Sequence, residues 1–114
     1  RQHFPHLLIG ISTHQKEQAL QAAQEGADYI GVGPIFPSPT KHFETFAGLT
    51  YLQESAQIFQ GPRFAIGGIH SKNINEILTH QGDRIALSSA LLQAEDIVAT
   101  TREFRQILDS LEKP

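Results

Sequence analysis

The segment GVGPIFPSPTK, residues 31–41, holds the densest group of side chains that suit an anion. Ser38 and Thr40 offer hydroxyl groups, and Lys41 offers a compact cation. The lysine follows a Pro-Ser-Pro-Thr run in which Pro39 limits the freedom of the backbone. Hydroxyl donors next to a constrained lysine predict a site for a phosphate or diphosphate group.

Two later segments predict the rest of an anion site. Gly67 and Gly68 remove side chains, so that backbone N–H groups can approach an anion closely. Ser88 and Ser89 lead into an expected helix start, where free N–H groups and the helix dipole favour negative charge. A tight turn at the glycines and a simple helix cap at Ser89 are the structural alternatives.

Ser12, Thr13 and His14 follow the first apolar run of the chain. Either hydroxyl is a candidate cap for the next helix, and Ser12 is also a candidate ligand contact. His14 is either an ordinary residue at a helix start or a catalytic proton carrier. The other histidines have neither ligand spacing on one helix face nor carboxylates at fixed offsets, so we expect no metal site built from this chain alone.

Strands and helices are expected to alternate along the whole chain. Apolar runs predict strands at 7–12, 29–33, 63–68 and 84–89. Helices are expected at 15–26 with a C-cap at Gly26, at 49–59, from an N-cap at Ser71 to about 82, and from 95 onward. Apolar rather than alternating strands are typical of a parallel sheet covered by helices.

The fold class is therefore α/β, with residues 1–114 as a single domain. Four βα units are half of a (β/α)8 TIM barrel, which needs about 200 or more residues. A half-barrel leaves two open sheet edges and an unfilled interior. We therefore expect a missing N-terminal half or self-association to complete it.

Composition excludes several partners. Nine Lys and Arg against twelve Asp and Glu, with no run of like charges, argue against nucleic acid and membrane surfaces. No stretch approaches the roughly 20 apolar residues of a membrane span, and the first ten residues lack the apolar core of a signal peptide. Together with the absence of cysteine, this predicts a soluble, cytoplasmic protein.

Four segments, IGISTH, GADYIGVGPIFPSPTK, AIGGI and LSSALLQAED, occur in that order, and together they resemble the thiamine phosphate synthase family. The resemblance covers essentially the whole chain and corresponds to strands five to eight of that family's barrel. It implies thiamine biosynthesis by a transferase. In this family, hydroxymethylpyrimidine diphosphate is joined to a thiazole phosphate, and diphosphate is released.

The resemblance also implies roles for individual residues. Ser12 matches a serine that contacts the pyrimidine diphosphate, and Lys41 matches the lysine that steadies its phosphates, which makes these two the catalytic candidates. The remaining substrate contacts match the thiazole phosphate site. Ser38, Pro39 and Thr40 match the family's Thr-x-Thr segment, with Ser38 in place of the usual threonine. Gly68, Ser88 and Ser89 match the backbone cradle for the same phosphate.

The family's other diphosphate ligands and the two aspartates that hold Mg²⁺ belong to its first half, which this sequence lacks. Mg²⁺ is therefore expected for the complete enzyme with ligands outside this chain, and the chain alone is expected to be inactive. Two alternatives remain open. One is a thiazole tautomerase, a family with the same barrel in which His14 would shuttle protons, and the other is a non-catalytic module that binds phosphate ligands.

Overall fold

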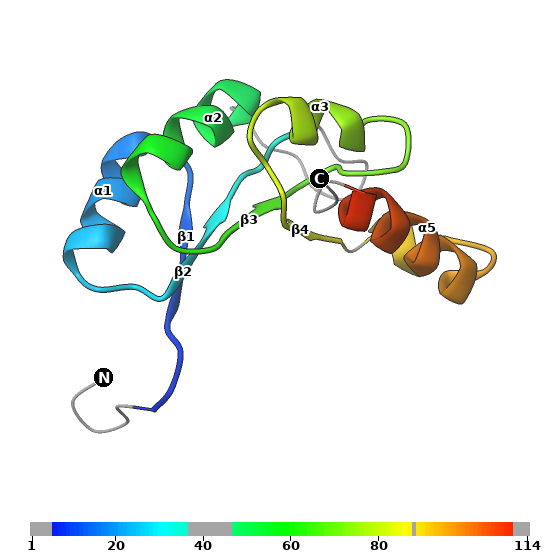
Figure 1. Ribbon diagram of the computed structural model, residues 1–114, viewed down its shortest axis with the longest axis horizontal. Helices are drawn as coiled ribbons and strands as arrows, with labels where there is room; N and C mark the ends of the chain where they lie inside the picture. The colour runs from blue at the N-terminus through cyan, green and yellow to red at the C-terminus, as the bar shows by residue number, and fades with distance from the viewer. Residues whose placement is uncertain (1–5, 37–46, 88, 111–114) are drawn as a thin grey trace.

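The computed structural model describes residues 6–36, 47–87 and 89–110. In this part of the chain, strands and helices alternate as expected (Figure 1). The elements are β1 (Gly10–Thr13), α1 (Lys16–Gln24), β2 (Tyr29–Val32), α2 (Gly48–Ile58), β3 (Arg63–Ile66), α3 (Ile74–Thr79), β4 (Ile85–Ala86), α4 (Ser89–Leu92) and α5 (Ile97–Asp109).

The four strands form one parallel sheet in the order β1-β2-β3-β4. Ser12 lies opposite Gly31, Gly31 lies opposite Phe64, and Ile66 lies opposite Ala86. The prediction of an α/β fold with a parallel sheet is confirmed. The strands are shorter than the apolar runs suggested, because only residues that meet a neighbouring strand join the ladder.

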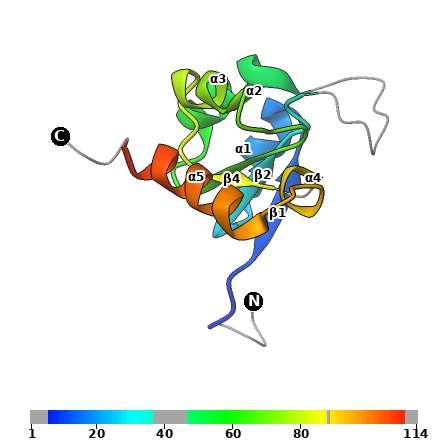
Figure 2. The same cartoon turned by 90° about the vertical axis from the view of Figure 1, so that its right-hand side faces the viewer.

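The two faces of the sheet differ sharply. Ile30 and Val32 on β2 and Ala65 on β3 are fully buried and belong to one cluster with residues of α1, α2 and α3. They pack with Leu52, Ile74 and Ile77, three further side chains without exposed surface. Figures 1 and 2 show these three helices on one side of the sheet. On the opposite face, Ser12, Gly31 and Phe64 line a concavity to which no described helix contributes. The hydrophobic core thus lies on the helix side.

Two helix starts differ from expectation, and α3 ends at Thr79 instead of near residue 82. Gly26 ends α1 as predicted, with a φ of 81°; its N–H bonds to the Ala23 carbonyl, and the next N–H bonds to the Ala22 carbonyl, which is a Schellman motif. The N-cap of α3 is Asn73, two residues beyond the expected Ser71. The last long helix begins at Ile97, because the Asp96 carboxylate accepts a hydrogen bond from the Ala99 N–H and caps it.

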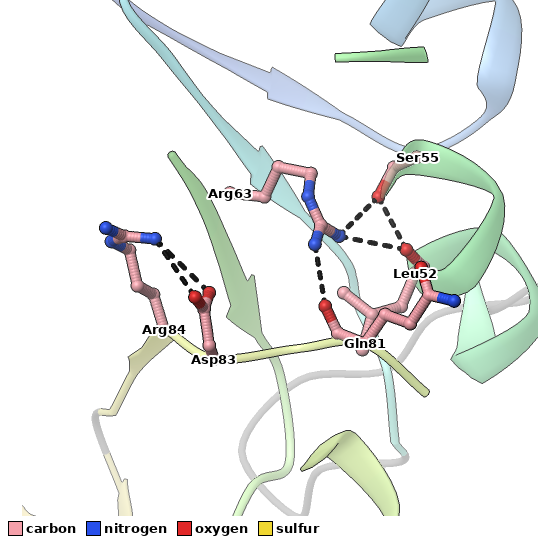
Figure 3. A network of polar contacts seen from close by, with 6 residues as sticks. All are labelled: Leu52, Ser55, Arg63, Gln81, Asp83 and Arg84. Carbon is pink, nitrogen blue, oxygen red and sulfur yellow. Dashed lines mark hydrogen bonds and ion pairs between the residues drawn. The ribbon is translucent and has the colours of Figure 1, made fainter. Parts of the chain in front are cut away.

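Arg63 joins three elements on the helix side of the sheet (Figure 3). Its guanidinium donates to the Leu52 carbonyl at 3.1 Å and to the Ser55 hydroxyl at 3.0 Å, both on α2. It also donates to the Gln81 carbonyl at 2.6 Å, in the turn before β4. Burial lowers the pKa of Arg63. The half-buried guanidinium thus contacts acceptors within α2 and in the α3–β4 turn.

We expect Arg63→Met to lower the free energy of unfolding of the complete protein by about 3 kcal/mol, because partly buried acceptors lose a charged donor. Arg105→Met is the matched control, since Arg105 is exposed on α5 and pairs with Asp109 one turn away. Its cost should stay within about 0.5 kcal/mol. Urea unfolding measures both variants, and equal losses would contradict this role of Arg63.

Candidate functional site

A buried hydrogen-bond chain holds the carboxyl ends of β1 and β2 together. The Tyr51 hydroxyl on α2 donates to Thr13 Oγ1 at 2.6 Å, and the Thr13 hydroxyl donates to the Gly31 carbonyl at 2.7 Å. Thr13 is 1% exposed and Tyr51 4% exposed. Burial raises the pKa of the Tyr51 phenol above its ordinary value. The Thr13 side chain therefore anchors the strand end instead of capping α1, and its neighbour Ser12 points to the opposite face.

His14 adds a second tie between the same two strands. Its Nδ1 lies 2.6 Å from the Gly33 carbonyl oxygen, which can only accept, so Nδ1 carries the proton. The His14 backbone N–H donates to Gln18 Oε1 at 2.6 Å. The imidazole thus has a definite structural role at the strand ends, and Nε2 is the ring nitrogen outside this contact.

The first part of the predicted phosphate segment packs against the end of β3. The Ile35 N–H donates to the Ile66 carbonyl at 3.0 Å, and the Phe36 N–H donates to the Gly67 carbonyl at 3.1 Å. A Cβ on Gly33 would lie 2.2 Å from the Ile66 oxygen, and a Cβ on Gly67 would lie 2.8 Å from Pro34 Cα. Gly33 and Gly67 therefore allow two backbone segments to touch. The glycines were expected to admit an anion, whereas at Gly67 the described contact is with the chain itself.

Asn73 supports the loop that carries Gly68. Its side-chain amide donates to the Gly68 carbonyl at 2.9 Å, and its Oδ1 accepts from the His70 N–H at 2.8 Å. Gly68 has a φ of 66°, a conformation that favours glycine. Sequence reasoning missed Asn73, although an asparagine five residues after a glycine pair and just before a helix is a recognisable turn signal.

The open face of the sheet forms a concavity of about 800 Å³. Ser12 and Gly31 lie in its floor beside Phe64, and Ile66 and Ala86 continue the floor toward β4. Ile66 is 47% exposed, an unusual value for an isoleucine in a parallel strand. The volume of the concavity is within the usual range for small-molecule sites.

Several predicted site residues lie outside the described residues: Ser38, Pro39, Thr40, Lys41 and Ser88. Ser89 is the first residue of α4.

Among the described residues, no three His, Cys, Asp or Glu side chains are grouped so that they would hold a metal ion. In the same part of the chain, no helix is both long and apolar enough to cross a membrane.

Comparison with known proteins identifies the family. The sequence model of the family described as "Thiamine monophosphate synthase" matches residues 1–91. The chain belongs to this family. It is 43% identical over 105 residues to a thiamine-phosphate synthase of Gloeobacter violaceus. This match covers 92% of this chain and 31% of that protein. It is 40% identical over 107 residues to the thiamine-phosphate synthase of Pyrococcus furiosus, over 94% of this chain and 52% of that protein.

The solved structure of a thiamine phosphate pyrophosphorylase from Pyrococcus furiosus has a similar fold, with a TM-score of 0.83 and 38% sequence identity. The similarity covers 96% of this chain and 52% of that structure. The chain thus spans between about a third and about half the length of these family members. The family assignment made from the four sequence segments is confirmed.

The Tyr51 contact predicts a stability change at high pH. The unfolded phenol loses its proton near pH 10.0, while the folded phenol keeps it to a higher pH. Its contribution to stability is therefore complete below pH 10 and declines as the pH rises above it. At pH 8, Tyr51→Phe should cost about 1 kcal/mol through the lost hydrogen bond. The difference from wild type should shrink toward pH 11 in urea unfolding of the complete protein, and a constant or growing difference would contradict it.

Proposed function

We propose that this chain is the C-terminal half of a thiamine phosphate synthase. The complete enzyme would join hydroxymethylpyrimidine diphosphate to a thiazole phosphate. In this reaction, the bond between the pyrimidine methylene carbon and the diphosphate oxygen breaks, and diphosphate leaves with the electron pair. The thiazole nitrogen then forms a new bond to that carbon. Family membership and the curated thiamine-phosphate synthases that match most of this chain support the proposal.

The observation that carries the proposal is the convergence of three strand ends at one edge of the sheet. The Gly33 N–H bonds to the Thr13 carbonyl, and Ile35 and Phe36 bond to the end of β3. Ser12, the start of the GPIFPSPTK segment and the Gly67-Gly68 loop therefore come from neighbouring positions. In parallel α/β folds, this carboxyl edge is where ligands bind.

We propose that the substrate phosphates bind at this carboxyl edge of the sheet. Lys41 would neutralise charge on the departing diphosphate, and Ser12 would donate a hydrogen bond to the same substrate. Ser38, Pro39 and Thr40 would hold the thiazole phosphate together with Gly68, Ser88 and Ser89. The reaction needs charge stabilisation and orientation more than acid or base catalysis, so cations and fixed donors are the effective groups.

The half-barrel proposal rests on the uncovered sheet face and on the share of each relative that the chain spans. The four strands, with residues 1–114 as one domain, would correspond to strands five to eight of a (β/α)8 barrel. The first half would close it, and a self-paired chain would be the substitute. As the family resemblance implies, Mg²⁺ would take its ligands from the first half of the barrel.

The complete protein should form thiamine phosphate from the two substrates, and Lys41→Ala should reduce kcat/KM by about 100-fold or more, as expected when a charge-stabilising group is removed. Lys16→Ala is the matched control, because Lys16 is exposed at the start of α1 and should retain nearly full activity. A Lys41→Ala enzyme with unchanged kcat/KM would remove Lys41 from the site.

His14→Ala separates the synthase from the thiazole tautomerase alternative. The synthase should keep most of its kcat, because His14 acts there by tying Gly33 to β1. A tautomerase would lose nearly all of its activity with the histidine. Loss of thiamine phosphate formation with His14→Ala at unchanged stability would contradict a purely structural role of His14.

The pure 114-residue chain should form no measurable thiamine phosphate, because the leaving diphosphate would lack most of its neutralising groups. It should also associate, since the open sheet face is largely apolar and β1 and β4 are edge strands of the described sheet. A turnover assay and light scattering test the two statements. Activity of the isolated chain would overturn the division of the site between two halves, and a well-behaved monomer would count against self-association.

A further inference from the structure

Gly31 is the one described glycine without a structural reason to be glycine. Four others have positive φ values: Gly26, Gly48, Gly67 and Gly68. At another four, Gly10, Gly33, Gly61 and Gly82, an added Cβ would approach a neighbouring atom to between 2.2 and 2.8 Å. At Gly31 the nearest atoms to an added Cβ are Ser12 Cα at 3.8 Å and Ser12 Oγ at 4.0 Å, which is ordinary contact, and φ is not positive.

Glycine at this place has a cost that no described contact offsets. In a strand interior it destabilises by about 0.5–1 kcal/mol relative to alanine. Within a strand it commonly marks the close approach of a ligand or another backbone. No described segment approaches Gly31 on the open face, where it lines the 800 Å³ concavity. Within the described chain, the space above Gly31 is therefore open.

The neighbours of Gly31 define the shape of that space. Ser12 is opposite on β1 and Phe64 is opposite on β3. The Phe64 ring also makes an edge contact with Tyr29, with ring centroids 5.6 Å apart and an interplanar angle of 77°. A bare peptide surface between a hydroxyl and an aromatic ring suits a flat ring, which packs on the peptide and meets the phenylalanine edge to face or offset.

We propose that Gly31 is a specificity-determining residue, and that the planar heteroaromatic ring of a phosphate-bearing substrate lies over it between Ser12 and Phe64. The inference rests on the proposed function and deepens it. Gly31 lies within β2, whereas Gly33 to Phe36 and Gly67-Gly68 form the carboxyl edge. A ligand with its phosphate at that edge would place its ring deeper in the concavity, at the level of Gly31.

Gly31→Ala in the complete protein tests the proposal. An added methyl group on the floor should raise the KM of one ring-bearing substrate by about 10-fold or more, as a single carbon does in a close-fitting pocket. The KM of the other substrate should change less than about two-fold. Which of the two rises identifies the ring over Gly31. Calorimetric binding of inorganic diphosphate, which has no ring, should be unchanged.

Stability provides the second readout. The urea midpoint of Gly31→Ala should equal or exceed that of wild type, because alanine in an unstrained strand restricts the unfolded chain. Gly26→Ala is the control: Gly26 has a φ of 81° and nothing within 4 Å of an added Cβ. It should lower the midpoint and leave both KM values unchanged, which separates a loss of stability from a change in the site.

Two kinetic outcomes overturn the proposal, and calorimetry decides if the enzyme proves inactive. Unchanged KM values for both substrates mean that neither ring lies over Gly31. A lower midpoint with both KM values raised equally means that a side chain from the covering part of the protein fills the space. If wild type makes no thiamine phosphate, the proposed function fails, and calorimetry with each ring-bearing substrate then decides. If a ring-bearing substrate binds to wild type and not to Gly31→Ala, the proposed ring position over Gly31 is supported. If it binds to neither protein or to both, the proposed ring position is rejected.

Discussion

The contact between the chain leaving β2 and the end of β3 is the constraint on which the candidate site depends. Gly33 lies against the Ile66 carbonyl and Gly67 against Pro34, distances that no side chain at either position would permit. Two backbone hydrogen bonds, from Ile35 and Phe36, hold this approach. A larger residue at Gly33 or Gly67 would separate the strand tips and, with them, the groups assigned to the two phosphates.

The two faces of the sheet differ in how far the described residues cover them. Arg63 and the chain from Tyr51 through Thr13 to Gly31 satisfy their polar groups within the described residues. On the open face, by contrast, Ile66 and Phe64 line a concavity. Parallel sheets are ordinarily covered on both faces. The half-length match to the Pyrococcus furiosus structure and the open face thus support the same proposal, that another half completes the barrel.

Local signals predicted most of the fold because they are local in origin. Apolar runs located all four strands, and Gly26 marked the end of α1 through its positive φ. The errors lay where a side chain had more than one possible partner. Asn73 rather than Ser71 occupies the N-cap position of α3, and its side chain makes no capping hydrogen bond but contacts the Gly68 carbonyl and the His70 N–H instead. Thr13 was a reasonable cap by sequence, but burial beneath α2 gave it Tyr51 as a partner instead.

By itself, the sequence determined the order of strands and helices, the parallel sheet and the family, because propensity, hydrophobic period and motif spacing are properties of contiguous residues. Only the tertiary structure decided which glycines contact another segment of the chain and which one faces open space. Gly33 and Gly67 serve contact between segments more than 30 residues apart, and Gly31 faces an open concavity. The sequence letters are identical at all three positions, and the difference arises from what the folded chain brings within a few ångströms of each Cα.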